Sequence, residues 1–542
     1  MPIIKTDIAI IGGGIAGITL ALDLLDQGEQ RSILLLDAQS EDNFGGLAKG
    51  AFGGMMFVDT PLQRKSGIRD SSELALRDWE NFAEFGAGDH WPRAWAKYYV
   101  ENVTGQVHDW IRGLGLKFLP AVQWVERGLY QPGNSVPRYH IIFGTAQHLI
   151  TILIARLKEA AKDGHLTLLF NHQVRNLSVR QGQVTGFDGH DLNTDSPFTV
   201  EAATTVIATG GIGGNVDKVI QNWSREWGNP PDKILNGCHP TADGHLHDQV
   251  TELGGQVTHL DKMWNYAAGI AHPQPDFDGH GLSLVPTRSS LWMDHKGQRI
   301  GPQPLITGFD TNYLCQQLAA QEKPWSWQVM NWKIASRELA ISGADHNPDL
   351  RDRKFLKLIV KLLLADDGLL RQMVATSEDF IVADTLPELT AKMNKLTGKD
   401  YISAPFMEQQ ISAYDSRLAR GPKLHNDDQI RRIAQLRAWG GDRIRTCKFQ
   451  QILDKKAGPL VAIRTHLITR KSLGGIQTNL DCAVLKADGS QISGLYAVGE
   501  ATGFGGGGAS GKRSLEGTFL SGCILTARRA AEVISGSLKV TS

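Results

Sequence analysis

Cysteine is scarce in this chain, with five residues among 542 and no C-x-x-C pair. This scarcity excludes a disulfide framework and argues against a zinc or iron–sulfur site, so we expect no metal. Scattered single cysteines are typical of proteins in a reducing compartment. The N-terminus also lacks the pattern of a signal peptide, and we therefore expect a cytoplasmic protein.

An excess of charge of either sign is also missing. Lys and Arg together number 57, and so do Asp and Glu. A balanced chain has no electrostatic footprint for nucleic acid or for an anionic membrane. No apolar run approaches the ~18 residues of a membrane span. These absences leave an ordinary globular protein, for which we expect two or three domains, since one core rarely serves a chain of this length.

Glycine, in contrast, is abundant, and its first cluster has a recognisable pattern. The apolar run Ile8–Ile11 predicts a buried parallel strand. Gly12, Gly14 and Gly17 then fit G-x-G-x-x-G, in which the glycines allow a tight turn, a close approach to a pyrophosphate and packing of the next helix. The helix expected over residues 16–26 would direct its N–H groups at the phosphates.

A carboxylate follows at the spacing that a ribose requires. The strand predicted over residues 32–36 ends at Asp37, about 20 residues beyond the glycines. A lone glycine pattern is weak, and a glycine turn without a ligand is the alternative. The strand, turn, helix and acid together favour a dinucleotide site.

Further glycine and strand signals continue this domain. Residues 43–56 are rich in glycine without helical or strand periodicity, which suits backbone that runs close along a ligand. Residues 173–179 and 183–187 predict a hairpin, and 204–208 a buried strand closed by Thr209-Gly210-Gly211. This order is typical of two-dinucleotide-binding-domain flavoproteins, whose sheet is interrupted and resumed much later.

A second ligand-facing turn lies near the C-terminus. The strand predicted over 495–498 ends in Gly499-Glu500, and a helix over 515–534 follows. Glu500 is placed to accept hydrogen bonds from ribityl hydroxyls. The helix N-terminus would stabilise an anionic reduced flavin by about 0.3–2 kcal/mol. One such turn at each end of the chain matches one long cofactor and favours FAD over NAD.

Between these turns the sequence pattern changes at about residue 258. Strand signals thin out, and the first fold returns near Gly458 with a strand at 460–463. The expected fold is α/β: a two-dinucleotide-binding-domain (Rossmann-like, glutathione-reductase-like) FAD domain over 1–257 and 457–542, with an inserted, mostly helical α+β cap or substrate domain over 258–456. Such inserts often close over a cofactor and exclude water. Helices are predicted in the cap over 326–342, 350–365, 386–397 and 427–439.

Several segments together resemble a known superfamily. They are the Gly12–Gly17 turn with Asp37, the Gly45-Gly46…Gly53-Gly54 run, AlaThrGlyGly at 208–211 and GlyLeuTyrAlaValGlyGluAlaThrGly at 494–503. The combination is similar to the fumarate reductase/succinate dehydrogenase flavoproteins, among which are 3-ketosteroid dehydrogenases. A closer resemblance, to a family of predicted FAD-binding dehydrogenases, is carried by AsnSerValProArgTyrHis at 134–140, ProLeuIleThrGlyPheAspThr at 304–311 and the 505–519 run.

The resemblance implies a set of cofactor contacts. Gly12, Gly14 and Gly17 would hold the pyrophosphate, Asp37 the adenosine ribose, and Val174 the adenine through its backbone. The 45–54 glycines would run toward the flavin, Glu500 would hold the ribityl chain, and Leu515–Thr518 the pyrimidine edge. Covalently flavinylated relatives have a His near the position of Leu47, so non-covalent FAD is implied. The full predicted set is Gly12, Gly14, Ile15, Ala16, Gly17, Asp37, Ala38, Gly45, Gly46, Leu47, Gly53, Gly54, Val174, Ala208, Thr209, Gly210, Gly499, Glu500, Leu515, Gly517 and Thr518.

The resemblance also points to cations in the active site. Fumarate reductases carry His-Thr-Met-Gly-Gly where this chain has Lys471 before Leu473-Gly474-Gly475, and Arg513 falls near their second substrate-clamping arginine. Such cations would bind a carboxylate or polarise a carbonyl beside the reacting C–H bond. For Arg464 and Arg513, pairing with surface acids is the alternative. The predicted catalytic set is Arg513, His466, Arg470, Lys471 and Tyr266.

The proton-transfer group stays open among Tyr266, His239, His466 and Tyr139. Histidine suits neutral pH best, although a lone histidine is more often structural. Steroid dehydrogenases have a Tyr-rich segment near the last glycines. Here that segment, AlaSerGlyLysArgSer at 509–514, contains no tyrosine, which speaks against a 3-ketosteroid substrate.

These features predict an FAD-dependent dehydrogenase or reductase. It would move hydride between flavin N5 and a C–H or C=C next to a carbonyl or carboxylate, or an alcohol carbon. Its partners would be a small-molecule substrate and an unidentified electron acceptor. The alternatives are an oxidase or monooxygenase, although no second G-x-G-x-x-G for NADPH is present, and an electron-transfer flavoprotein subunit.

Overall fold

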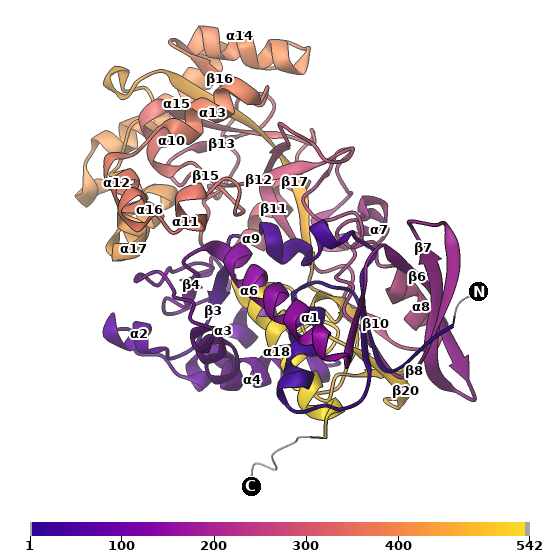
Figure 1. Ribbon diagram of the computed structural model, residues 1–542. Coiled ribbons are helices and arrows are strands. Elements are labelled where there is room, and N and C mark those ends of the chain that lie inside the picture. The colour runs from indigo at the N-terminus through magenta and orange to yellow at the C-terminus, as the bar shows by residue number, and fades with distance from the viewer. Residues whose placement is uncertain (1–2, 537–542) are drawn as a thin grey trace. The chain divides into compact units, whose positions relative to one another are not determined.

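The computed structural model describes residues 3–536, apart from the side chain of Leu362, and the chain divides into two compact units (Figure 1). The first unit combines the chain up to residue 222 with residues 238–264 and the chain from 471 onward. The second unit combines residues 223–237 and 265–470. The functional division at 257/258 and 456/457 into an FAD domain and a cap stays a prediction.

A mostly parallel sheet is the centre of the first unit. Its strand order is β19-β20-β8-β1-β2-β5, and the β6–β7 hairpin joins it through β8. In β1, Ile10 lies between Leu35 of β2 and Val206 of β8. The strands are β1 (Ile3–Ile11), β2 (Ile33–Leu36), β5 (Leu166–Leu169), β6 (His172–Arg180), β7 (Gln183–Asp191), β8 (Ser196–Ile207), β19 (Ala483–Leu485) and β20 (Gln491–Ala497).

Both faces of this sheet are buried, which explains the continuous apolar run in β1. Ile8 and Ile10 belong to one hydrophobic core, whereas Ala9 and Ile11 belong to the core on the other side. Helices α1 (Ile15–Asp26) and α18 (Thr518–Ile534), from opposite ends of the chain, pack side by side (Figure 1). The predicted helix over 16–26, the hairpin and the terminal helix are thereby confirmed.

Shorter elements complete the first unit. Strand β3 pairs with β4, and β10 pairs with β18. These elements are β3 (Gly54–Met56), β4 (Tyr139–Ile141), β10 (Val257–Thr258), β18 (Gly475–Ile476), α2 (Pro61–Lys65), α3 (Ser72–Ala83), α4 (His90–Val103), α5 (Trp110–Gly113), α6 (Thr145–Ala160), α7 (Val216–Gln221) and α8 (His245–Glu252).

The second unit contains a sheet that the sequence did not predict. Its order is β13-β14-β17-β11-β12-β15, with β9 and β16 also on β17. The chain passes between the units inside β11 and β17, so the first residues of β11 and the last of β17 belong to the first unit. These strands are β9 (Leu235–Asn236), β11 (Met263–Ala271), β12 (Gly281–Val285), β13 (Leu291–Met293), β14 (Ser326–Asn331), β15 (Ala340–Ile341), β16 (Phe380–Ala383) and β17 (Leu460–Ser472).

Two predictions are corrected here. The helix predicted over 326–342 is wrong, because residues 326–331 form β14, and all six of them are buried. A fully buried strand shows no alternation of polar and apolar residues, so its periodicity does not reveal it. The side chain of Asn331 accepts a hydrogen bond from the Ile334 N–H and starts α10. The strand at 460–463 exists, but it lies in the second unit, with Ala462 opposite Val329 and Ile381.

The other helices of the second unit follow their apolar periodicity. The helix predicted over 386–397 is confirmed, and those over 350–365 and 427–439 are confirmed in their main parts. Among the described residues, no helix is long and apolar enough to cross a membrane. The helices are α9 (Thr311–Ala319), α10 (Trp332–Glu338), α11 (Pro348–Arg351), α12 (Phe355–Leu364), α13 (Gly368–Thr376), α14 (Leu386–Thr397), α15 (Ala404–Ala419), α16 (Asp428–Ala438) and α17 (Gly440–Arg443).

Candidate cofactor and active site

The three glycines after β1 have the geometry of a phosphate-binding turn. Gly12 has φ +108°, and an added Cβ would lie 2.5 Å from the Ala208 carbonyl oxygen. A Cβ on Gly17 would lie 2.0 Å from the Gly12 carbonyl oxygen, so this glycine lets α1 pack on the turn. A Cβ on Gly14 would meet nothing within 4 Å. The second glycine therefore faces open space, where a pyrophosphate can approach.

A pocket beside this turn is lined by the residues predicted for the adenosine. Its walls include Gly12, Asp37, Ala38, Val174 and Thr209. The Asp37 carboxylate accepts hydrogen bonds from the Gly13 N–H at 2.6 Å and the Gln39 N–H at 2.7 Å, which fix its orientation. Burial raises the pKa of the Asp37 carboxyl, and these two hydrogen bonds and nearby His239 oppose the shift.

The second glycine run lies against the first. The Gly45 N–H donates to the Gly13 carbonyl at 3.2 Å, and a Cβ on Gly46 would lie 3.0 Å from the Gly14 Cα. Leu47 is exposed and has no group that could bond to a flavin. A Cβ on Gly53 would lie 2.6 Å from the Ala146 N at the start of α6. The run therefore passes from the phosphate turn toward β3, as expected for backbone along a cofactor.

Glu500 is held at the end of β20, next to the opening turn of the chain. Its Oε1 accepts a hydrogen bond from the Ser472 N–H at 3.0 Å. A Cβ added to Gly211 would lie 2.7 Å from this Glu500 oxygen. A Cβ added to Gly499 would lie 2.8 Å from the Ala16 Cβ at the start of α1. The carboxylate is thus fixed near the ends of β8 and β20, where the predicted ribityl chain would run.

The start of α18 lies beside β3 and β4. The N-cap Gly517 has φ +102°, and its carbonyl accepts the Met56 N–H at 2.8 Å. The Tyr139 ring packs against Gly517, since a Cβ added to Gly517 would lie 2.8 Å from the ring. The Tyr139 hydroxyl packs against Gly54, where an added Cβ would lie 1.7 Å from the hydroxyl oxygen. Tyr139 therefore stands where the two segments predicted for the flavin ring meet.

These features fit a bound dinucleotide. Helices α1 and α18 both begin at glycine N-caps without a side-chain cap, which leaves their first N–H groups for a ligand. All predicted cofactor residues lie in the first unit, including Ile15, Ala16, Ala208, Gly210, Leu515 and Thr518.

Lys471 joins an aromatic group at the start of α18. Its Nζ lies 4.4 Å from the centre of the Phe519 ring, a cation–π contact. Phe519 also contacts Trp264, whose indole N–H donates to the Glu516 carboxylate at 3.1 Å. The predicted Lys471 is therefore brought close to Gly517 and Thr518 of the predicted flavin site.

Arg513 has an acidic partner in the same unit. Its guanidinium lies 2.9 Å from the Glu84 carboxylate, which also pairs with Lys512 at 3.3 Å. Both cations lower the pKa of Glu84, against the effect of burial. This ion pair supports a structural role that ties the 505–514 segment to the end of α3, and the catalytic role of Arg513 stays a prediction.

The remaining catalytic candidates lie in the second unit. Arg470 lies over the Tyr266 ring at 5.4 Å and donates to the Gly237 carbonyl at 3.0 Å. His466 is buried, with Nδ1 2.8 Å from the Pro324 carbonyl, and burial lowers its pKa to about 4. The catalytic role of His466 stays a prediction. Arg464 pairs with the buried Asp379 at 2.7 Å and with the exposed Glu378 at 2.9 Å.

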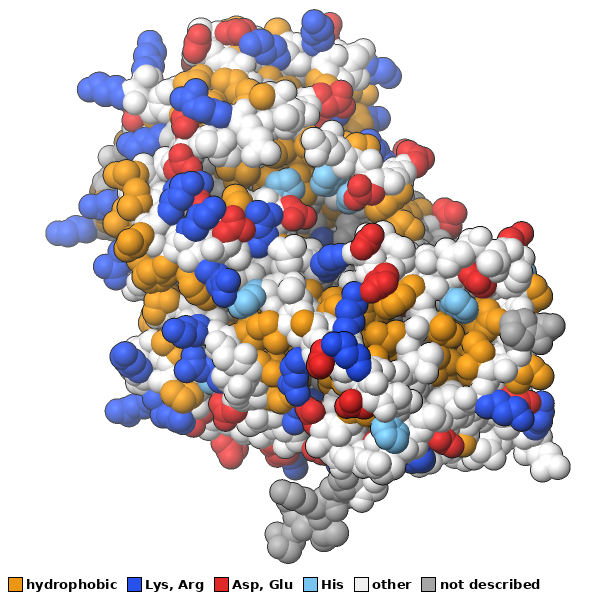
Figure 2. Space-filling model, viewed as in Figure 1, with side chains coloured by type: hydrophobic (Ala, Val, Ile, Leu, Met, Phe, Trp, Pro, Cys, Tyr) orange, Lys and Arg blue, Asp and Glu red, His pale blue; other side chains and the backbone are white. Residues whose placement is uncertain are grey.

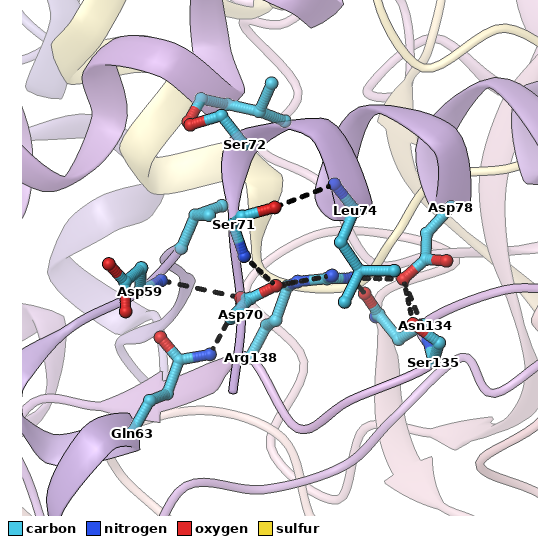
Figure 3. Close-up of polar contacts among 12 residues, drawn as sticks. Asp59, Gln63, Asp70, Ser71, Ser72, Leu74, Asp78, Asn134, Ser135 and Arg138 are labelled. Carbon is cyan, nitrogen blue, oxygen red and sulfur yellow. Dashed lines mark hydrogen bonds and ion pairs between the residues drawn. The ribbon is translucent and has the colours of Figure 1, made fainter. Parts of the chain in front are cut away.

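Sequence reasoning assigned no role to Arg138, yet it is the centre of a buried network in the first unit. Figure 3 shows its guanidinium between Asp70 and Asp78. It lies 2.7 Å from the Asp70 carboxylate and 2.6 Å from the Asp78 carboxylate, and it donates a hydrogen bond to the Asn134 amide oxygen at 2.9 Å. Arg138 directly precedes Tyr139, so this network anchors β4 and the tyrosine on it. The sequence feature that could have indicated this role is the position of Arg138 inside the AsnSerValProArgTyrHis motif at 134–140.

Replacing Arg138 by methionine is expected to destabilise the protein by about 3–5 kcal/mol, because two aspartates would be left buried without their cation. Denaturant unfolding of the FAD-loaded protein measures this change. The matched control is Arg156→Met, which removes an ion pair to Asp26 between half-exposed side chains. That change should cost less than about 1 kcal/mol. Equal unfolding midpoints for both variants would contradict the importance of the buried network.

The fold and site together define an FAD-dependent oxidoreductase of the α/β class. Residues 7–520 match the FAD binding domain family, and the chain belongs to that family. A KsdD-like steroid dehydrogenase of Mycobacterium tuberculosis is 39% identical over 97% of this chain and 95% of its own length. One of Mycolicibacterium smegmatis is 38% identical over 95% of this chain and 96% of its own length.

Solved structures show the same fold. The open conformation of a flavocytochrome c3 fumarate reductase superposes with a TM-score of 0.69 at 19% identity, covering 99% of this chain and 79% of the other. A 3-ketosteroid delta1-dehydrogenase from Sterolibacterium denitrificans gives 0.69 at 16% identity, covering 98% and 100%. The predicted cofactor, FAD, and the predicted fold class are therefore confirmed.

Proposed function

We propose that this protein is a steroid dehydrogenase that removes or adds hydrogen at a C–C bond beside a carbonyl group. The observation that carries the proposal is the 38–39% identity, over at least 95% of this chain, to proteins named KsdD-like steroid dehydrogenases. The absence of tyrosine from residues 509–514 had spoken against a 3-ketosteroid substrate, and this proposal replaces that expectation. The position of Tyr139 supports the change, because it supplies a phenol from another part of the chain.

We assign the proton chemistry to residues of the first unit. FAD, when bound, supplies the hydride chemistry. The half-buried Tyr139 hydroxyl, beside Gly54, is the group that gives or takes a proton at the substrate. The Lys471 ammonium polarises the carbonyl oxygen of the substrate, and this makes the adjacent C–H bond more acidic. The buried aromatic side chains of Trp264 and Phe519 exclude water.

We also propose that the FAD is held non-covalently by the predicted residues of the first unit. The second unit then determines the substrate, and Tyr266, Arg470, His466 and Arg513 keep catalytic roles only as predictions. We propose the cytoplasm as the compartment, which is supported by five single cysteines scattered along the sequence. The electron acceptor is left to experiment.

A substrate screen with an artificial dye acceptor tests the function. Steroids with a keto group, dicarboxylates and secondary alcohols are offered anaerobically to the FAD-loaded protein. We expect steroids to bleach the visible flavin band and to reduce the dye. Bleaching by alcohols alone, or reoxidation of the photoreduced protein by fumarate alone, would overturn the steroid assignment. Reoxidation by air in under about a second would instead indicate an oxidase or monooxygenase.

A further inference from the structure

A histidine and an aspartate of the first unit meet at the glycine loop of residues 505–508. The His259 Nδ1 lies 3.1 Å from the Gly507 carbonyl oxygen, and the His259 Nε2 lies 2.9 Å from the Asp89 Oδ1. The Thr258 hydroxyl donates to the same carbonyl at 2.9 Å. The side chains of His259 and Asp89 are only 21% and 16% exposed, so little water competes for these hydrogen bonds.

These contacts determine the protonation state of the imidazole. A carbonyl oxygen and an ionised carboxylate only accept hydrogen bonds, so both ring nitrogens of His259 have to donate. A neutral imidazole has one N–H, whereas the imidazolium has two. The Asp89 carboxylate is itself held in place, because its Oδ2 accepts the Gly86 N–H at 2.7 Å. His259 is therefore an imidazolium that bonds to a carboxylate on one side and to the glycine loop on the other.

The loop that this pair holds depends on its neighbours for its conformation. Its four consecutive glycines all have positive φ, and such a run has no strong preference of its own. A Cβ added to Gly505 would lie 2.6 Å from the Trp95 ring, so the packing is close. His259 has φ +59°, and Phe504, which precedes the loop, has φ +64°. Non-glycine residues keep such backbone only where the surroundings impose it, and they cluster at functional sites.

The same loop connects the two segments predicted to hold the flavin end of FAD. It follows Glu500, predicted for the ribityl chain, and precedes Leu515–Thr518, predicted for the pyrimidine edge. The Gly503 N–H donates to the Glu500 carbonyl at 3.0 Å, and the Gly507 N–H donates to the Thr502 carbonyl at 2.9 Å. A shift of the loop is therefore expected to move the backbone of Glu500.

We propose that the protonated His259–Asp89 pair positions the 505–508 loop for FAD. This role presupposes the FAD placement proposed above, and it is independent of the substrate. Loss of the proton leaves one ring nitrogen without an N–H opposite an acceptor, so one of the two hydrogen bonds is lost. The pair therefore holds the loop fully at low pH, and FAD is held more weakly as the pH rises through the deprotonation of His259.

Other charged groups near the pair are bonded elsewhere or exposed. Asp261 and Lys262 lie 2.8 Å from each other, and Glu84 forms the ion pairs described above. His90 is exposed and packs edge-on against Trp91. Figure 2 shows acidic and basic side chains interspersed on the face that it draws, and salt screens such exposed charges beyond about 10 Å. Titration of the His259–Asp89 pair is therefore the change expected to move the loop.

The rate at which the full-length, FAD-loaded protein releases its flavin tests the proposal. Release is followed as a rise in flavin fluorescence after dilution at about pH 5.5–9, the range in which histidines titrate. We expect the wild type to release FAD about tenfold faster at the upper end, the effect of one lost hydrogen bond to a charged group. His259→Gln should release FAD fast at every pH. The control His90→Gln removes the neighbouring imidazole and should follow the wild type.

Asp89→Asn separates positioning by charge from simple packing. The amide keeps an oxygen for the Gly86 N–H but removes the charge that stabilises the imidazolium, so the rise in release rate should move to lower pH. The flavin spectrum should stay unchanged. Hydrogen exchange of the FAD-loaded protein gives a second measurement, because the amides of residues 503–511 should exchange faster in His259→Gln than in the wild type.

Coincident pH profiles of the wild type and His259→Gln would overturn the proposal, and so would an unshifted profile of Asp89→Asn. Glu500→Ala, measured in parallel, distinguishes this failure from a failure of the FAD placement. Fast release from Glu500→Ala with wild-type release from His259→Gln overturns only the role of the His259–Asp89 pair. Wild-type release from both variants overturns the placement of FAD as well.

Discussion

Glu500→Ala is expected to purify with markedly less FAD than the wild type. The carboxylate is held by the Ser472 N–H beside the turn at Gly499. A hydrogen bond to a charged group contributes about 1.5–3 kcal/mol, so the dissociation constant of FAD should rise about ten- to a hundredfold. The ratio of flavin to protein absorbance gives occupancy, and titration of the stripped protein with FAD gives the affinity.

Two variants make this result specific. Glu500→Gln keeps an acceptor oxygen and should lose less FAD than the alanine variant. Glu41→Ala removes an exposed acid of the same unit, whose carboxylate pairs with Lys158 at the surface, and should retain full FAD. Full occupancy in Glu500→Ala would count heavily against the placement of the ribityl chain.

Tyr139→Phe is expected to lower kcat for a steroid substrate by about 10²–10⁴, the range for loss of a general acid or base. The ring that packs beside Gly517 is kept, so FAD content should not change. Stopped-flow bleaching of the flavin separates the chemical step from substrate binding. The loss should appear in kcat, because only the hydroxyl that exchanges a proton is removed.

Tyr130→Phe provides the comparison for this variant. Tyr130 is an exposed tyrosine of the same unit, and its variant should keep wild-type turnover. If Tyr139→Phe also turns over at the wild-type rate, the proton-transfer role passes to another group, and Tyr266→Phe is the next variant to measure. A variant that loses FAD together with activity would show that Tyr139 has a role in cofactor binding instead.

Much of the candidate cofactor site could be predicted because its signals are local in sequence. The strand, glycine turn and helix around Gly12–Gly17 depend on neighbouring residues, and the structure has them in the predicted order. The same holds for Gly499, Glu500 and the terminal helix. Glycine patterns report backbone geometry directly, and backbone geometry is what a phosphate turn requires.

The sheet of the second unit was less predictable. In β14, burial on both sides removes the alternation that would distinguish a strand from a helix, so residues 326–331 carried no clear periodicity. Strand β17 looked like the return of the first fold, yet its pairing with β14 and β16 places it in the other unit. Pairing partners far apart in the sequence decide such cases.

The sequence alone determined the cofactor class, the opening and closing turns that would hold it, and the Rossmann-like fold around them, because each depends on short-range patterns. Only the tertiary structure decided which charged side chains form structural ion pairs and which lie near the candidate site. It paired Arg513 with Glu84, buried Arg138 between two aspartates, and brought Tyr139 to Gly54 and Gly517. These outcomes depend on distances between segments that are far apart along the chain, and no spacing rule encodes them.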